Sequence, residues 1–114
     1  SPRTFDVYGF CGLSLLSEFF HHGDIQDRIY AKEEDQVPDA ITTPEQKIVL
    51  ALEMAESLAD LHGNKNGMII HGDVQLGQFL LNNDKTILKL NDFNRAEFLL
   101  WDDTHQAYCQ HRNG

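Results

Sequence analysis

The stretch His71–Asn94, HGDVQLGQFLLNNDKTILKLNDFN, contains two acidic residues that each lie next to a short apolar run. Asp73 comes shortly after the run MII of residues 68–70, and Asp92 comes shortly after the run ILKL of residues 87–90. Short runs of Ile and Leu bounded by Gly, Asn and Asp are typical of β-strands. The sequence therefore predicts a small sheet that carries one carboxylate just beyond the end of each of two strands.

Two neighbouring carboxylates with an amide between them form an oxygen-rich site. Gln78 lies between Asp73 and Asp92 in the sequence and supplies such an amide. Mg²⁺ takes oxygen ligands and usually binds together with substrate phosphates, so the three residues are consistent with Mg²⁺ and a phosphate-bearing ligand. Asp is also common as a residue that caps turns. The residues by themselves leave both interpretations open.

The clearest predicted element is a helix in TTPEQKIVLALEMAESLADLHGN, residues 42–64. Thr43 can cap its start, Pro44 suits its first position, and Gln46 completes a capping box. We expect Gly63 to end the helix in the left-handed conformation. A wide apolar stripe should follow one face of this helix. It comprises Ile48, Leu52, Ala55, Leu58, Ala59 and Leu61.

Shorter elements are predicted on both sides of this helix. Residues 5–12 and 13–20 are expected to form the two strands of a hairpin. The spacing of Ile25 and Ile29 indicates a short amphipathic helix from Asp24 to Glu34 with Asp24 as its cap. The other predictions are a loop over residues 35–44, strands at 78–81 and 87–90 joined by a turn at 82–86, and a second hairpin within residues 96–111.

Composition and charge exclude several classes of protein. The chain has 114 residues, of which 41% are hydrophobic and 24% charged, as in ordinary globular proteins. Its net charge of −9 and its lack of a Lys/Arg cluster argue against nucleic-acid binding. Cys11 and Cys109 are far apart, which suits a reducing compartment better than a disulfide scaffold. No membrane association is evident in this segment, and we expect an intracellular, cytoplasmic protein.

The segments HGDVQLGQFLL and LKLNDFN together resemble the catalytic loop and the metal-binding motif of the protein kinase family. The family pattern H-R-D-L-K-x-x-N aligns with His71–Gln78, and D-F-G aligns with Asp92–Asn94. Upstream, LLSEFFHHGDI at residues 15–25 resembles the strand and hinge between the two kinase lobes. The helix at residues 42–64 resembles the long helix that leads into the catalytic loop. These four elements occur in the family's order.

The resemblance implies an α+β fold of the protein-kinase-like type, in partial form. The glycine-rich phosphate loop, the strand Lys with its helix Glu partner and the A-P-E segment do not occur in the sequence. We therefore expect a single incomplete kinase domain over residues 1–114 that is inactive by itself. Within it, residues 1–17 correspond to the last N-lobe strands, 18–24 to the hinge, 25–94 to the C-lobe with the catalytic loop and metal motif, and 95–114 to the activation segment.

The resemblance also assigns catalytic and metal-binding roles. In the family the first acid accepts the proton of the substrate hydroxyl, and the second binds Mg²⁺ on the ATP phosphates. Asp73 is then the candidate base and Asp92 the candidate metal ligand. Gln78 occupies the position of a metal-binding Asn, and its amide oxygen could serve as a second ligand. Gln75 occupies the position of a Lys that steadies the transferred phosphoryl group.

A nucleotide-binding set follows from the same resemblance. Leu80 is expected to lie under the adenine, and the backbones of Glu18 and Phe20 are expected to meet its polar edge. Asp24 could reach the ribose, and Ser17 is at the position that guards the back of the pocket. The implied cofactors are ATP and Mg²⁺, and the implied partner is a protein substrate.

Several departures from the family pattern keep other functions open. Gln75, Gly72 and Asn94 stand where the family has Lys, Arg and Gly. A pseudokinase that binds without catalysis is one alternative. A small-molecule phosphotransferase similar to aminoglycoside or choline kinases is another, because the loop of those enzymes also reads H-G-D. The spacing of His105, Cys109 and His111 is compatible with zinc, but an exposed hairpin is the interpretation we favour there.

Overall fold

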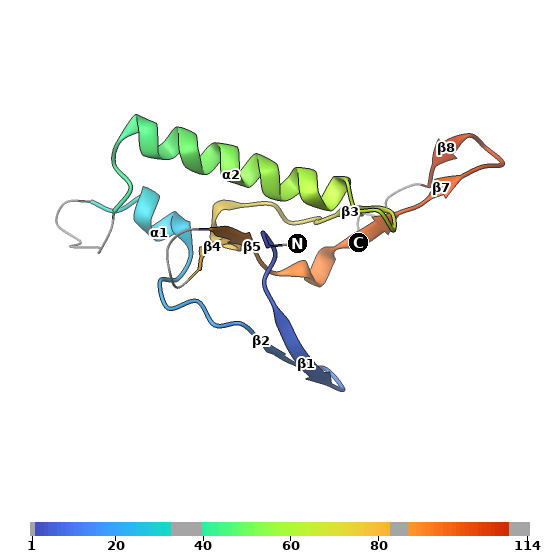
Figure 1. The fold of residues 1–114 in the computed structure, drawn as a ribbon, viewed down its shortest axis with the longest axis horizontal. Coiled ribbons are helices and arrows are strands. Elements are labelled where there is room, and N and C mark those ends of the chain that lie inside the picture. The colour runs from blue at the N-terminus through green and yellow to red at the C-terminus, as the bar shows by residue number, and fades with distance from the viewer. Residues whose placement is uncertain (1, 33–39, 83–86, 110–114) are drawn as a thin grey trace.

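A long helix and a two-stranded ribbon form the centre of the chain (Figure 1). The computed structural model describes residues 2–32, 40–82 and 87–109. Helix α2 (Pro44–His62) lies along the ribbon of β4 (Phe79–Leu81) and β5 (Leu88–Leu90), which pair antiparallel. This α+β arrangement encloses one apolar core. Its buried members are Ile25, Ile41, Leu50, Leu61, Phe79, Leu88 and Leu90.

The start of α2 has the predicted capping box. The Thr43 hydroxyl oxygen accepts a hydrogen bond from the Gln46 N–H at 3.2 Å, and the Gln46 side chain accepts one from the Thr43 N–H at 3.1 Å. The helix ends at Gly63 as expected, but the left-handed conformation predicted there is wrong, because Gly63 has φ −86° and ψ 9°. Its N–H still donates to the Ala59 carbonyl in the helical pattern, and the first positive φ after the helix occurs at Gly67.

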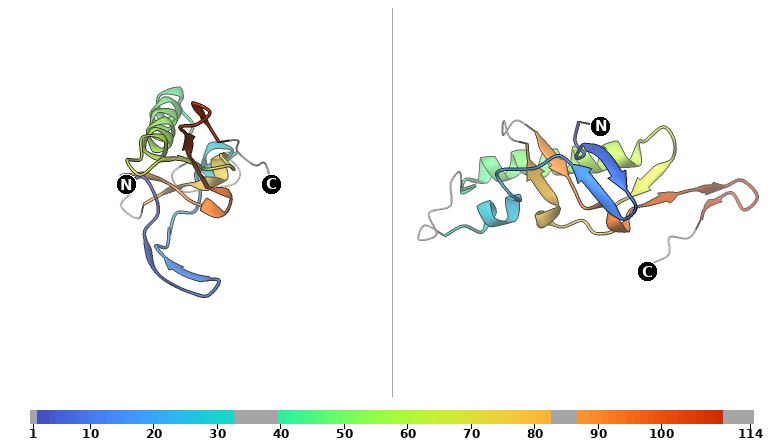
Figure 2. Two further views of the ribbon diagram at one scale, coloured as in Figure 1. Left: turned by 90° about the vertical axis from the view of Figure 1, so that its right-hand side faces the viewer. Right: turned by 90° about the horizontal axis from the view of Figure 1, so that it is seen from below.

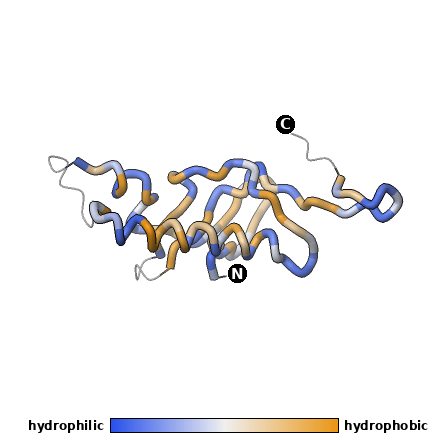
Figure 3. Tube along the Cα trace, turned by 90° about the horizontal axis from the view of Figure 1, so that it is seen from above, coloured by the Kyte–Doolittle hydropathy of each residue, from blue (hydrophilic) through white to orange (hydrophobic). Residues whose placement is uncertain are grey.

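The predicted apolar stripe of α2 is only partly buried. Leu61 is in the core and Leu58 packs against it, but Ile48 and Leu52 are 70% and 59% exposed. The stripe spans more of the helix circumference than the narrow β4–β5 ribbon covers, and the ribbon packs along the line of Leu50, Met54 and Leu61. Figure 3 shows the many apolar residues along α2. The uncovered stripe consists of Ile48, Val49, Leu52, Ala55 and Ala59, all of which are exposed.

Two hairpins project from this body (Figure 2). Strands β1 (Val7–Cys11) and β2 (Ser14–Ser17) pair antiparallel around a turn in which Gly12 has φ 58°. Strands β7 (Trp101–Asp102) and β8 (Ala107–Tyr108) also pair antiparallel, and the Trp101 and Tyr108 rings meet edge to face across them. Both predicted hairpins are therefore confirmed.

The helix predicted from Asp24 to Glu34 is shorter than expected. Helix α1 (Ile25–Ile29) begins at the predicted cap, since an Asp24 carboxylate oxygen accepts hydrogen bonds from the N–H groups of Gln26 and Asp27. It ends at Ile29 because the next residue, Tyr30, is 68% exposed and gives the helix no further apolar anchor. Residues 33 and 34, the first half of the predicted 35–44 loop and nearly all of the 82–86 turn lie outside the described residues.

One strand pairing was not predicted. Strand β3 (Met68–Ile70) pairs antiparallel with β6 (Glu97–Leu99), which brings the chain after Asp92 back beside the chain before Asp73. Two short 3₁₀ helices, η2 (Leu76–Gln78) and η3 (Phe93–Arg95), follow the two acidic residues. The ends of β3 and β5 are thereby held together. None of the described helices has both the length and the apolar character needed to cross a membrane.

We expect the double variant Ile48→Gln/Leu52→Gln to associate with itself less than the parent chain, because an uncovered apolar stripe drives association. Its free energy of unfolding should stay within about 0.5 kcal/mol of the parent value, as is usual for surface positions. Sedimentation velocity and urea denaturation measure the two effects. The control Leu50→Ala, on the buried face, should lose about 2–5 kcal/mol. Equal destabilisation of both variants would show that the stripe is covered.

Candidate functional site

A buried histidine ring joins the loops that carry the two acidic residues. His71 is 2% exposed, and its Nε2 lies 2.7 Å from the Asn91 carbonyl oxygen. A carbonyl only accepts, so Nε2 carries a proton and donates, while Nδ1 accepts from the Asp73 N–H at 3.3 Å. The Phe93 ring packs against the imidazole at a centroid distance of 5.0 Å. The sequence did not indicate this bridging role of His71.

The Asp73 and Asp92 carboxylates meet at one amide group. The Gln78 Nε2 donates to Oδ2 of Asp73 and to Oδ2 of Asp92, both at 3.2 Å. Ionised carboxylates only accept hydrogen bonds, so the amide must present its NH₂ group to them. The Gln78 side chain is largely buried, and Gln75 lies at the edge of the same cluster with its Nε2 3.5 Å from both Asp73 oxygens. The structure thus brings the four predicted catalytic and metal-binding residues together.

Asp92 adopts an unusual backbone conformation. Its φ of 58° and ψ of 70° are left-handed, a region that Asp tolerates better than most residues that have a side chain. The conformation turns the chain from β5 into η3, and the Asp92 Oδ1 accepts from the Asn94 N–H at 3.5 Å. Residues held in sparsely populated conformations of this kind cluster at functional sites.

Gly72 fills a position that has no room for a side chain. Its φ is 79°, and a Cβ atom added to it would lie 2.5 Å from the Arg95 carbonyl oxygen. The loop between His71 and Asp73 therefore packs directly against the backbone at the end of η3. The local fold gives a physical reason for glycine in H-G-D.

The predicted adenine-binding residues lie around the β4–β5 ribbon. Leu80 forms an isolated bridge with Asp24 and stands opposite Lys89 in the ribbon. The Asp24 carboxylate caps α1, and the Phe20 carbonyl accepts from the Gly23 N–H at 3.3 Å. Glu18 reaches the ribbon through its side chain. The nucleotide contacts assigned to these residues remain predictions.

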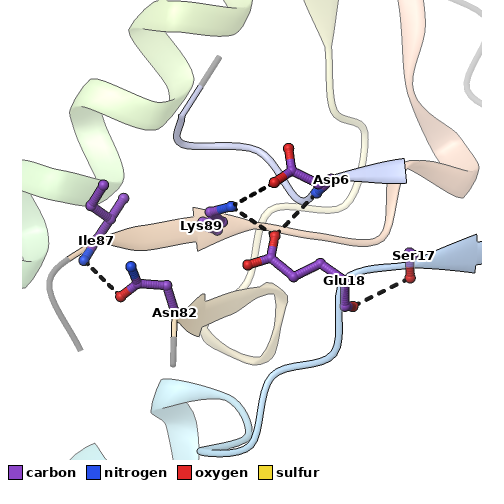
Figure 4. A network of polar contacts seen from close by, with 6 residues as sticks. All are labelled: Asp6, Ser17, Glu18, Asn82, Ile87 and Lys89. Atoms are coloured by element: carbon purple, nitrogen blue, oxygen red, sulfur yellow. Dashed lines mark hydrogen bonds and ion pairs between the residues drawn. The ribbon is translucent and has the colours of Figure 1, made fainter. Parts of the chain in front are cut away.

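A lysine that the sequence analysis missed anchors Glu18 (Figure 4). Lys89 is 8% exposed, and its Nζ lies 2.7 Å from Oε2 of Glu18 and 3.4 Å from Oδ2 of Asp6. Burial lowers the pKa of Lys89, but hydrogen bonds and charges from Glu18 and Asp6 outweigh burial and raise this pKa above its ordinary value of 10.5. Lys89 is therefore charged at neutral pH. The sequence signal was a single lysine in an apolar strand, whose acidic partners are 71 and 83 residues away.

A cleft of about 290 Å³ opens beside the acidic pair. This volume is near the lower end of the range for small-molecule sites. Phe5, Leu15 and Ser17 line it on the side of the β1–β2 hairpin. The opposite side consists of Gln78, Asn91, Asp92, Phe93 and Asn94. Predicted residues from both halves of the chain thus share one cavity.

The β7–β8 hairpin has its own polar contact. Nδ1 of His105 lies 2.6 Å from Oδ2 of Asp102, and this hydrogen bond holds the pKa of the Asp102 carboxyl below its usual 3.8. Cys109 is exposed, and His111 lies outside the described residues. Among residues 2–32, 40–82 and 87–109, no group of three or more His, Cys, Asp or Glu side chains is placed to hold a metal ion. A magnesium site at Asp73 and Asp92 would need the Gln78 amide, phosphates or water as further ligands.

Comparison with known proteins indicates a kinase-related region. No profile of a known protein family matches the chain. U-box domain-containing protein 33 from Arabidopsis thaliana is 30% identical over 100 residues, which cover 86% of this chain and 11% of that protein. Wall-associated receptor kinase-like 4 from the same plant is 32% identical over 91 residues, covering 80% and 11%.

An LRR receptor-like serine/threonine-protein kinase from Arabidopsis thaliana is 32% identical over 104 residues, covering 87% of this chain and 11% of that kinase. The chain thus spans about 11% of the length of the curated relatives that it matches.

We expect Gly72→Ala to lower the free energy of unfolding by about 1–3 kcal/mol, because the added methyl group must occupy a left-handed position against the Arg95 backbone. Gly77→Ala, in the nearby helix η2, is the matched control. Its Cβ would meet only the Gln26 side chain at 3.6 Å, so its effect should stay within about 1 kcal/mol. Urea denaturation measures both, and equal effects would contradict the close approach at Gly72.

Proposed function

We propose that this chain forms the central part of a protein kinase domain that transfers phosphate from ATP to protein hydroxyl groups. The observation that carries the proposal is the meeting of Asp73 and Asp92 at the Gln78 amide. These residues stand in the order of the family's catalytic and metal motifs. The similarity to plant receptor-like kinases supports the same interpretation. In this proposal the phosphate-binding loop belongs to another part of the domain.

Asp73 would act as the base that accepts the proton of the substrate hydroxyl. Its backbone N–H is held by the buried His71 ring, and its carboxylate is held by Gln78. These bonds fix the orientation of the carboxylate before a substrate arrives, which is the geometric requirement for efficient proton transfer. Gln75 lies beside the same carboxylate and would approach the transferred group as a neutral donor in place of a lysine.

Asp92 and Gln78 would hold Mg²⁺. Their oxygen donors fit this ion, which commonly uses one or two carboxylates together with phosphates and water. Mg²⁺ supplies positive charge that stabilises the phosphate groups of the nucleotide. The Asp92 carboxylate already faces the shared space between the two acids, whereas Gln78 presents its NH₂ group there and must rotate its amide to present an oxygen. Asp92 is therefore the stronger ligand in this proposal.

The nucleotide base would occupy the cleft between the β1–β2 hairpin and the Asp92 loop. Ser17 lines that cleft, and the segment from Glu18 to Asp24 continues from it toward Leu80. The adenine-edge roles of Glu18 and Phe20, the ribose contact of Asp24 and the position of Leu80 under the base are parts of this proposal.

A small-molecule phosphotransferase of the aminoglycoside or choline kinase type is the second candidate. The observation that favours it is the glycine-specific backbone of Gly72, which makes H-G-D an integral part of the loop. The two candidates differ in the acceptor. Full-length protein that phosphorylates choline or an aminoglycoside, and no protein substrate, would favour the second. A pseudokinase would bind nucleotide and phosphorylate neither.

Replacing Asp73 by Asn in the full-length protein should lower the rate of phosphoryl transfer by about 10²–10⁴-fold, the usual contribution of a positioned base. The Asn side chain keeps the shape of Asp but cannot accept the proton. Asp103→Asn, an exposed position in the β7–β8 turn, is the matched control and should leave the rate unchanged. A radiometric assay under single-turnover conditions provides the measurement. An unchanged rate in Asp73→Asn would remove this residue from the mechanism.

Asp92→Ala should weaken the binding of Mg-nucleotide more than Gln78→Ala does, because an ionised carboxylate is a stronger ligand for Mg²⁺ than a neutral amide. Calorimetric titration of each full-length variant with Mg-ATP gives the comparison. Circular dichroism of both variants checks that each is folded. A larger loss of affinity in Gln78→Ala would reverse the proposed order of the two ligands.

A further inference from the structure

The cleft beside the acidic pair has two walls that belong to separate parts of the chain. The hairpin wall consists of Phe5, Leu15 and Ser17. The carboxylate wall consists of Gln78 and residues 91–94. The width of the cleft, and so the ligand that it accepts, depends on how the β1–β2 hairpin is fixed to the ribbon that carries the carboxylate wall.

One ammonium group holds both ends of the hairpin. Asp6 directly follows Phe5, Glu18 directly follows Ser17, and both acidic side chains bind the Lys89 Nζ (Figure 4). The Asp6 N–H also donates to Oε2 of Glu18 at 3.2 Å. Lys89 lies in β5, two residues before Asn91 of the carboxylate wall. The three side chains thus connect the hairpin wall to the strand that leads into the opposite wall.

We call the contacts of Lys89 with Glu18 and Asp6 the clamp. The Lys89–Glu18 pair is its stronger part. Their side chains are 10% and 15% exposed, so water and salt screen the pair weakly. Asp6 is 63% exposed and 3.4 Å away, which makes its contribution smaller. Removal of Lys89 takes away the cation that binds Glu18, and removal of Glu18 leaves Lys89 with only the exposed Asp6, so the clamp should open when either buried partner is lost.

The carboxylate wall is held by different bonds. His71 binds the Asn91 carbonyl, and the Asn91 N–H donates to the Gln78 carbonyl at 2.8 Å. The Gln78 amide in turn binds Asp92. None of these bonds involves the side chain of Lys89. Loss of the clamp should therefore move the hairpin wall and leave the carboxylate wall in place.

We infer that Lys89 is a positioning residue, which acts through Glu18 to set the spacing between the two walls and thereby the affinity of the cleft for the base of a nucleotide. This inference rests on the proposed function of the site. It assigns to Lys89 a role in selecting the ligand, although Lys89 does not line the cleft.

Two ligands test the two walls separately in the full-length protein. Adenosine is neutral, so its binding reports the shape of the cleft without a direct charge effect. Mn²⁺, observed by electron paramagnetic resonance, reports the carboxylate wall. Lys89→Met and Glu18→Gln should each raise the adenosine dissociation constant about tenfold, within the range of couplings between contacting residues. The Mn²⁺ dissociation constant should change less than about twofold.

The pair of variants separates position from charge. Lys89→Met removes a positive charge and Glu18→Gln removes a negative one, so a purely electrostatic effect would have opposite signs in the two. Lys89→Arg keeps the charge and should retain most of the adenosine affinity. Lys65→Met, an exposed lysine, is the matched control and should change neither constant. If Lys89→Met does not fold, Glu18→Gln carries the test.

The possible results differ for the inference and for the proposed function. A parallel loss of adenosine and Mn²⁺ binding, or no loss of adenosine binding, overturns the inference. Parent protein that binds no adenosine contradicts the proposed function instead. In that case, comparison of amide hydrogen exchange between the parent protein and Lys89→Met tests whether the clamp holds the hairpin. Faster exchange in Lys89→Met that is confined to residues 7–24 supports it, and unchanged exchange there overturns it.

Discussion

Burial of the β4–β5 ribbon against α2 is the interaction on which the other elements depend. Phe79, Leu88 and Leu90 are at most 1% exposed, and complete burial of such a side chain contributes roughly 1.5–3 kcal/mol. Gln78 precedes β4 and Asn91 follows β5 at the same end of the ribbon, where the Asn91 N–H donates a hydrogen bond of 2.8 Å to the Gln78 carbonyl. The apolar packing therefore fixes the places from which both halves of the candidate site extend.

Neutral groups hold the two acidic side chains of that site. The amide of Gln78 bridges them, and uncharged His71 joins their loops through backbone atoms. A neutral amide offsets only part of the repulsion between two carboxylates, whose charges interact strongly at short distance away from bulk water. The chain as a whole carries a net charge of −9. A cation is thus attracted to the pair by both the local and the overall charge.

Local signals were sufficient to predict much of the fold. The capping box at Thr43, the Asp24 cap, the two hairpins and the acids beyond the strand ends all follow from residues that are close in sequence. The buried face of α2 did not follow, because apolar periodicity cannot show how wide a partner the helix meets. The β3–β6 pairing and the Lys89–Glu18 contact join segments far apart in the chain, so their signal exists only after folding. The left-handed Asp92 likewise has no distinct signature in sequence.

The backbone of Asp92 has a consequence for how the site responds to its surroundings. A left-handed residue with a side chain costs on the order of 1–2 kcal/mol, which the hydrogen bonds of the Asp92 carboxylate with Gln78 and Asn94 help to offset. The position of the carboxylate beside Gln78 is thus coupled to the left-handed backbone. An ion that binds only the left-handed form stabilises that form. At ion concentrations above the dissociation constant, this stabilisation grows with the logarithm of the ion concentration. Free metal would then act on the shape of the loop as well as on its charge, and the fraction of molecules with an assembled acidic pair would follow the ionic composition of the solution.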